Sequence, residues 1–337
     1  MTSGIPEPAE ALISQLRDCY KALRKNMAQV VVGQEEALRC LTTGLLCGGH
    51  MLMVGVPGLA KTLMVRALAE ALGWKFRRIQ FTPDLMPTDI TGTEILQSEE
   101  GGLRRELAFH RGPIFANLIL ADEINRTPPK TQAALLEAMQ ERAVTVNGKT
   151  YALQPPFVVI ATQNPIEQEG TYPLPEAQLD RFMLSIWMDY PSKAQELAIA
   201  ARPPRMQIPK MEPIAGAGEF ETFVDALDQV PVSEHVLEYA VNLTTASRPK
   251  DAGADAYVRN YVAWGVGPRG TQHLVTASKA AAILDGRPSP EVEDVRAMAL
   301  PVLRHRILPN YNALGEGIDA ANIVAHLLEH AHEPAAA

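Results

Sequence analysis

The segment Gly55-Val56-Pro57-Gly58-Leu59-Ala60-Lys61-Thr62 constrains this chain more than any other. The apolar run Met51 to Val54 precedes it, and a helical pattern begins near Leu63. A strand, a glycine-containing turn, Lys-Thr and a helix, in this order, predict a phosphate-binding loop formed by backbone N–H groups and a helix N-terminus. We expect Lys61 to pair with phosphate charge and the Thr62 hydroxyl to bind Mg²⁺.

The loop departs from the usual G-x-x-x-x-G-K-[ST] pattern at one position, because Ala60 stands where the last glycine is expected. A structural turn before a core helix therefore stays open as an alternative to ATP binding. On the nucleotide-binding interpretation, the contacts to ATP or ADP come from Gly55, Pro57, Gly58, Leu59, Ala60, Lys61, Thr62 and Leu63.

A second motif, Asn117-Leu118-Ile119-Leu120-Ala121-Asp122-Glu123, predicts a buried parallel strand that ends in two carboxylates. Open α/β sheets bind ligands at this end of their strands. We expect Asp122 to hold Mg²⁺ and Glu123 to polarise the attacking water. The alternative is a strand that ends in a solvated acidic turn. The phosphate-binding loop upstream favours the catalytic interpretation.

The composition bounds the class of protein. The chain has 337 residues, 47% apolar and 21% charged, which suits a globular protein of two domains. Its net charge of −8 argues against a protein whose main task is to bind nucleic acid. No apolar run reaches the ~20 residues of a membrane span, and the first residues lack the pattern of a signal peptide. Three cysteines without metal-site spacing suit a reducing compartment, so we expect a cytoplasmic location.

The pattern along the chain alternates strands and helices up to about residue 190. A helix is expected over 9–26, and a second one from Glu35 to about Cys47. Residues 82–113 form an excursion with a hairpin-like segment, and 144–153 form a hairpin with an Asn-Gly turn. Beyond Tyr190-Pro191 the pattern is helical, with proline-rich breaks at 203–213.

The order of these elements resembles that of an AAA+ ATPase, and within that class the MoxR family. The most specific shared segments lie at 32–35, 55–62, 121–126, 161–165 and 174–182. Ala60 is similar to this family's form of the loop. The excursion at 82–113 resembles the helix-2 insert of one AAA+ branch, and the hairpin at 144–153 resembles its hairpin before sensor 1. Both are shared with helicases and magnesium chelatases.

The resemblance implies further roles. Asn164 would be sensor 1, although an Asn before Pro165 also suits a simple turn. Arg181 would be an arginine finger that reaches the neighbouring subunit, with Arg126 as its rival. The alternative for Arg181 is an ion pair with Glu176 or Asp180.

Two more roles come from the same resemblance. Arg269 would be sensor 2, acting on its own subunit or on a neighbour, rather than a helix-start arginine. Val32, Gly33 and Gln34 would lie against the adenine, with a plain core strand as the alternative.

The fold class expected is α/β: an AAA+ P-loop NTPase domain with a parallel sheet at 1–190, and a smaller helical lid at 191–337. ATP would bind between them at the subunit interface of a homo-oligomeric ring, most simply a hexamer. The resemblance implies a chaperone-like ATPase that remodels a protein substrate with a von Willebrand factor A domain partner, often in metalloenzyme maturation.

The sequence allows three other interpretations of its function. A DNA-acting, helicase-like motor is disfavoured by the net charge and by a hairpin tip whose basic residue is Lys149. A magnesium-chelatase-like motor subunit stays open. The H-x-x-E-H pattern from His326 to His330 matches some zinc proteases, but a solvated helix end is the simpler interpretation.

Overall fold

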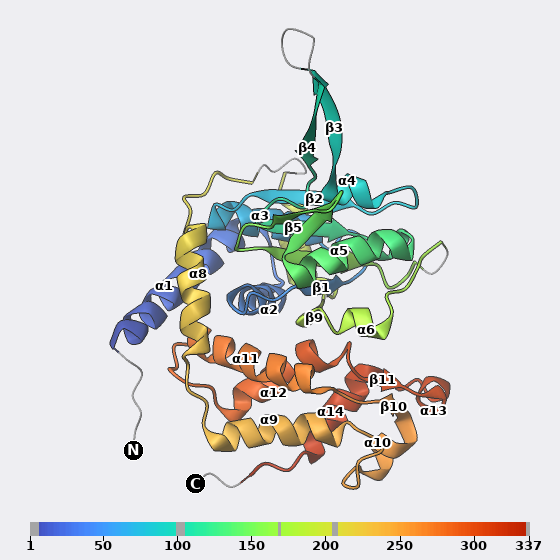
Figure 1. Ribbon diagram of the computed structural model, residues 1–337. Helices are drawn as coiled ribbons and strands as arrows, with labels where there is room; N and C mark the ends of the chain where they lie inside the picture. Colours follow the sequence, from blue (N-terminus) through green and yellow to red (C-terminus); the bar gives the residue numbers. More distant parts are fainter. Residues whose placement is uncertain (1–6, 99–104, 168–169, 204–207, 335–337) are drawn as a thin grey trace.

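The structure is a computed structural model that describes residues 7–98, 105–167, 170–203 and 208–334. Within these ranges, five parallel strands form one sheet in the order β2-β5-β8-β1-β9 (Figure 1). The strands are β1 (Met51–Val54), β2 (Phe76–Gln80), β5 (Leu118–Asp122), β8 (Val158–Gln163) and β9 (Leu184–Trp187). All residues of β1 and β5 are buried, which explains their continuous apolar sequences. The predicted α/β class is confirmed.

Helices cover both faces of this sheet. Met51 and Met53 of β1 point into one apolar cluster, and Leu52 and Val54 point into the other, because side chains alternate along a strand. The first cluster is completed by α1 (Glu7–Val30), α2 (Glu35–Leu46) and α3 (Lys61–Leu72), and the second by α4 (Pro87–Thr91) and α5 (Pro129–Glu141). Helix α1 is longer than the predicted 9–26.

The two predicted excursions are hairpins. Strands β3 (Gly92–Ser98) and β4 (Arg105–Arg111) form an antiparallel pair that projects from the body of the molecule (Figure 1). Strands β6 (Ala143–Val146) and β7 (Lys149–Ala152) are joined by Asn147 and Gly148, both with positive φ, as an Asn-Gly hairpin turn requires. Phe109 stacks on Tyr151 at 4.1 Å between ring centroids, so the two hairpins support each other.

The C-terminal part is helical, as predicted, apart from one short pair of strands. Between β8 and β9 lies α6 (Glu176–Leu179), and the chain continues through α7 (Lys193–Ala200), α8 (Ala217–Asp228), α9 (Glu234–Ala246), α10 (Ala256–Tyr261), α11 (Pro268–Leu284), α12 (Val292–Leu303), α13 (Tyr311–Gly315) and α14 (Ala320–His330). Strands β10 (Val262–Trp264) and β11 (Leu308–Pro309) form an antiparallel pair that the sequence did not indicate. No helix among the described residues is long and apolar enough to cross a membrane.

The segment after residue 190 first returns to the sheet domain. Helix α8 lies beside α1 in Figure 1, and its Phe220 packs edge-on against Trp74 at 4.8 Å between ring centroids. Only after α8 does the chain enter the helical layer formed by α9 to α14. The division into 1–190 and 191–337 stays a prediction.

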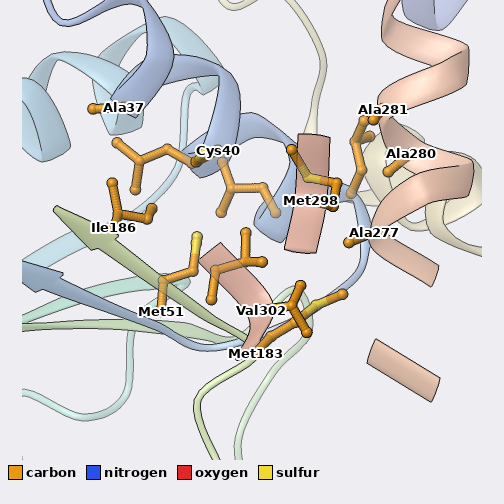
Figure 2. Close-up of a cluster of buried hydrophobic side chains, with 14 of the residues drawn as sticks. Ala37, Cys40, Met51, Met183, Ile186, Ala277, Ala280, Ala281, Met298 and Val302 are labelled. Atoms are coloured by element: carbon orange, nitrogen blue, oxygen red, sulfur yellow. The ribbon is translucent and has the colours of Figure 1, made fainter. Parts of the chain in front are cut away.

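The helical layer and the sheet share one apolar core. Figure 2 shows Met51 of β1, Ile186 of β9, Ala277 of α11 and Val302 of α12 in one cluster of buried side chains. Three methionines, Met51, Met183 and Met298, fill the space between them, which suits their flexible, unbranched side chains. The lid therefore packs directly on β9 and on Met183 just before it.

Candidate nucleotide-binding site

The predicted phosphate-binding loop follows β1 and leads into α3. The Gly55 N–H donates to the Gln163 carbonyl at 3.2 Å, which fixes the start of the loop beside the end of β8. Gly58 has φ +90°, a backbone conformation that suits glycine, and a Cβ there would meet no other protein atom within 4 Å. Helix α3 begins at Lys61, directly after the turn, as phosphate binding requires.

Ala60 is the N-cap of α3, with φ 59° and ψ 23°, in the left-handed region. This conformation costs a non-glycine residue roughly 1–2 kcal/mol. It explains why the usual form of the loop has glycine here.

Replacing Ala60 with glycine should raise stability by roughly 0.5–1 kcal/mol, because glycine adopts this conformation without strain. We expect a rise of about 1–2 °C in the thermal unfolding midpoint. The matched control is Ala67→Gly in the middle of α3, which should lower the midpoint, because glycine weakens a helix interior. A lower midpoint for Ala60→Gly would mean that the Ala60 methyl group packs better than its strain costs.

The Lys61 ammonium turns back onto its own loop. Its Nζ donates to the Gly55 carbonyl and, at 3.3 Å, to the Val56 carbonyl. Burial lowers the pKa of Lys61 from its usual value, and the carboxylates of Asp122 and Glu123 oppose that shift. The ammonium thus lies within the loop and faces the two carboxylates across it.

Asp122 lies at the end of β5 with both carboxylate oxygens engaged. Oδ1 accepts from the Thr162 hydroxyl at 2.6 Å, and Oδ2 accepts from Arg78 at 2.7 and 2.9 Å. The Thr62 hydroxyl lies 3.4 Å from the same Oδ2. A hydroxyl and a carboxylate oxygen this close are the hard oxygen ligands that Mg²⁺ prefers, so the residues present fit that ion.

Glu123 has a constrained backbone and a tethered carboxylate. Its φ of 58° is in the left-handed region, and its N–H donates to the Thr162 hydroxyl at 2.8 Å. Gln80 donates to Oε2 at 2.7 Å, and the Arg126 guanidinium lies 3.3 Å from the same oxygen. The Thr162 hydroxyl therefore positions both acidic residues, because it donates to the Asp122 carboxylate and accepts from the Glu123 N–H.

Asn164 follows β8 at the same edge of the sheet and is only 5% exposed. Its Oδ1 accepts from the Ile166 N–H at 3.2 Å, the contact that a turn-forming Asn makes. Since Gln163 is the residue paired with Gly55, Asn164 lies directly beside the start of the loop. The structure thus shows the turn contact and also the position that sensor 1 needs.

A cavity of about 320 Å³ adjoins the segment predicted to contact adenine. Gly33 and Gln34 line it together with Met64 of α3 and basic side chains of α1. Both Gly33 and Gln34 have positive φ, so this segment is a turn and not a core strand. The Gln34 side chain donates to the Asp189 carbonyl at 2.9 Å, which ties the cavity to the chain after β9.

Arg181 and Arg269 lie near the end of the sheet where its strands begin, opposite the end that carries the phosphate-binding loop. Met51 pairs with Leu184, so the residues just before β9 lie at the N-terminal end of β1, about 13 Å along the strand from the loop at its other end. Arg269, at the start of α11, lies 3.4 Å from Asp180. The structure brings these two arginines near each other and away from the phosphate-binding loop of their own chain.

The Arg181 side chain is half-buried and makes no hydrogen bond or ion pair with any other residue that the structure describes. The ion pair considered as its alternative role is absent within these ranges, because Asp180 is engaged by Arg269 and Arg306 instead. Arg126, the rival finger, lies beside Glu123 of its own chain and 2.8 Å from Glu167.

Comparisons with known proteins agree with this geometry. Residues 50–184 match the ATPase family associated with various cellular activities (AAA), and residues 254–327 match the AAA lid domain. The chain is 40% identical to Chaperone MoxR1 of Mycobacterium tuberculosis over 96% of this chain and 84% of that protein. It is 34% identical to the MoxR protein of Methylorubrum extorquens over 89% of this chain and 90% of that protein. The chain belongs to the MoxR family of AAA+ ATPases.

A crystal structure supports the same family. It is of a protein from Cytophaga hutchinsonii named as a candidate ATPase, with a TM-score of 0.89 and 40% identity. The match covers 98% of this chain and 99% of that one. The overall arrangement of sheet, insert and lid is therefore shared with a solved relative.

Sequence reasoning missed three residues at this MoxR-family site, namely Arg78, Gln80 and Thr162. Arg78 and Gln80 lie on β2, and Gln80 pairs with Asp122 in the sheet register. The available signal was the presence of polar residues in the segment before Phe81, which follows the phosphate-binding helix and suits a strand of the same sheet. Thr162 stood within a segment shared with the family, but only its neighbour Asn164 was assigned a role.

The zinc-protease pattern near the C-terminus has another explanation in this MoxR-family chain. His326 stacks between Tyr257 and His330, with ring centroids 4.0 and 4.1 Å away. Its Nε2 lies 2.6 Å from Asp255, the N-cap of α10. These contacts join α14 to α10 within the lid.

Proposed function

We propose that this chain is an ATP-hydrolysing, chaperone-like remodeller of protein substrates that works as a homo-oligomeric ring, with a hexamer as its assembly. The observation that carries the proposal is the distribution of functional groups over the two ends of the strands in one sheet. The C-terminal ends of the strands carry Lys61, Thr62, Asp122 and Glu123. The N-terminal ends lie near Arg181 and Arg269. A head-to-tail ring places the surface with the two arginines of one subunit against the phosphate-binding loop of the next.

The proposed chemistry is hydrolysis of ATP to ADP and phosphate. The loop N–H groups and Lys61 bind the phosphates, and Thr62 with Asp122 would hold Mg²⁺, which supplies positive charge to the phosphate oxygens when bound. Glu123 takes a proton from the attacking water, and Asn164 orients that water. Arg181 of the neighbour stabilises the charge that develops on the transferred phosphoryl group, and Arg269 responds to the nucleotide from the lid.

Replacing Lys61 with alanine should weaken ATP binding by about 100-fold, because charge-assisted hydrogen bonds worth up to about 3 kcal/mol are lost. Titration with a fluorescent ATP analogue measures this. Lys75→Ala, an exposed lysine just beyond α3, is the matched control and should bind normally. Unchanged affinity in Lys61→Ala would overturn the assignment of the loop.

The ring predicts that ATPase activity depends on assembly. The rate per subunit should rise with protein concentration and level off once rings are complete, because each site needs groups from two subunits. Turnover and particle mass are measured on the same dilution series. A constant rate per subunit, in samples shown by mass to be monomeric, would contradict a shared site.

The partner and cellular role rest on the family. The von Willebrand factor A domain partner and metalloenzyme maturation are what the resemblance implies, and a cytoplasmic location is proposed because three cysteines without metal-site spacing suit a reducing compartment. ATPase assays with and without single-stranded DNA test the helicase alternative, in which DNA would stimulate turnover. Capture of partners by Glu123→Gln protein in the presence of ATP tests the remodelling role.

A further inference from the structure

The segment that carries Arg181 has little structure of its own. It joins α6 to β9, and the Arg181 N–H donates to Gln178 only in a short turn, at 3.2 Å. The carbonyl groups of Asp180, Phe182 and Met183 lie outside regular structure and need other donors. We call residues 180–183 the finger segment.

Arg306 of the lid supplies a donor to each of these carbonyl groups, and His305 adds a second one to the Phe182 carbonyl at 2.9 Å. The Arg306 side chain, which follows α12, is 2% exposed. Its Nη2 donates to the Phe182 carbonyl at 2.7 Å and to the Asp180 carbonyl at 3.2 Å, and its Nη1 donates to the Met183 carbonyl at 3.1 Å. The backbone on both sides of Arg181 is therefore bound by one guanidinium.

The remaining donors of Arg306 complete the contact. Nε donates to Asp180 Oδ1 at 2.8 Å, Nη1 also donates to the Val302 carbonyl, and Nη2 donates to His273 Nδ1 at 2.7 Å. Burial lowers the pKa of His273 to about 4, so its ring is neutral and can accept. These acceptors outnumber the five N–H groups of Arg306, so every N–H has a partner and one Nη2 hydrogen is shared, which fixes the orientation of the guanidinium.

Arg269 contacts the same segment from the start of α11, through Asp180 Oδ2 at 3.4 Å. The lid thus binds Asp180 through two arginines, while the Arg181 side chain has no partner among the described residues. Arg181 is fixed at its backbone and left free at its guanidinium. This is the arrangement required of a group that must reach into another subunit.

We propose that Arg306 is a positioning residue for Arg181: from the lid, it holds the finger segment so that Arg181 projects toward ATP bound in the neighbouring subunit. The inference rests on the proposed function, because it takes Arg181 as the arginine finger. It predicts that the lid of one subunit controls hydrolysis in the next. The apolar core shared by the lid and β9 supports this, because it places the lid in direct contact with the strand that follows the finger segment (Figure 2).

The test variant is Arg306→Lys, which keeps the charge but replaces five donors in a rigid planar fork with three donors on one nitrogen, too few and too closely spaced for all the acceptors of Arg306. We expect turnover to fall by about 10²-fold, as for a small displacement of a catalytic group, with ATP binding unchanged. The matched control is Arg287→Lys, a lid arginine bonded to Asp294 at 2.6 Å and remote from the finger segment. It should lose comparable thermal stability and keep its turnover.

Mixed rings separate a positioning role from a merely structural one. A Lys61→Ala subunit binds ATP about 100-fold more weakly and is therefore nearly empty at an ATP concentration that fills the other subunits, but it still presents its Arg181. Mixed with Arg306→Lys subunits, which bind ATP, it should restore part of the activity. A mixture of Arg306→Lys with Arg181→Ala should restore none, because neither subunit presents the finger. Native mass measurement establishes that the rings are mixed.

The two mixtures with Lys61→Ala separate failure of the role of Arg306 from failure of Arg181 as the arginine finger. If Arg181→Ala with Lys61→Ala regains activity but Arg306→Lys with Lys61→Ala does not, Arg306 has another role and the inference fails while the finger stands. If neither mixture regains activity, the finger itself fails. Should Arg306→Lys not fold, Asp180→Asn replaces it, because it disturbs the same contact from the other side, and the same pattern of rescue is required.

Discussion

Replacing Glu123 with glutamine is expected to slow ATP hydrolysis by about 10³-fold while leaving ATP binding close to that of the natural protein. An amide of the same shape cannot take a proton from water. The change leaves Lys61, Thr62 and Asp122 untouched, so the groups that bind the phosphates remain in place. Single-turnover measurement of phosphate release, beside a binding titration, separates the two effects.

The matched control for this variant is Glu167→Gln. Glu167 also bonds Arg126, at 2.8 Å, but has no role in the proposed reaction. It should keep most of its turnover, which would show that loss of a carboxylate near Arg126 is not itself the cause. Turnover near the natural rate in Glu123→Gln would require a different base.

The backbone of Glu123 makes this experiment informative. Its left-handed φ of 58° and its N–H bond to Thr162 hold the residue at the strand end whatever its side chain is. Gln80 contacts Oε2 at 2.7 Å and holds the carboxylate in place. The amide of Glu123→Gln can keep a hydrogen bond with Gln80, and the variant therefore tests proton transfer and not folding.

The parts of the site that could be predicted from sequence are those made by neighbouring residues. A phosphate-binding loop is one strand, one turn and the start of one helix, so its pattern is continuous in the chain. The two acidic residues at the end of β5 were found for the same reason. Parallel pairing then brings strand ends together, which also placed Asn164 beside the loop.

The contacts that the sequence could not indicate join distant segments. Arg306 lies 126 residues from Asp180, and Arg269 lies 89 residues from it. A buried arginine in a helical segment has no local pattern, since its role depends on which carbonyl groups lack donors elsewhere. The β10–β11 pair was missed for a related reason, because two- and three-residue strands are too short for periodicity.

Arg181→Ala is expected to reduce turnover by about 10³-fold, the lower end of the range for arginine fingers, with ATP affinity nearly intact. The reason is the position of Arg181 at the edge of the sheet opposite its own phosphate-binding loop. Its guanidinium contributes nothing to ATP binding within one chain. Turnover at saturating ATP and binding of a fluorescent analogue measure the two quantities separately.

Mixing this variant with Lys61→Ala tests whether the arginine acts between subunits. A subunit that keeps Lys61 binds ATP, and a Lys61→Ala neighbour supplies the missing Arg181, so activity should partly return. Arg126→Ala is the comparison, because Arg126 lies 3.3 Å from Glu123 of its own chain and a neighbour cannot replace it. Rescue of Arg126→Ala but not of Arg181→Ala, in rings shown by mass to be mixed, would transfer the finger to Arg126. It would also mean that the contacts of Arg306 with residues 180–183 serve the lid alone.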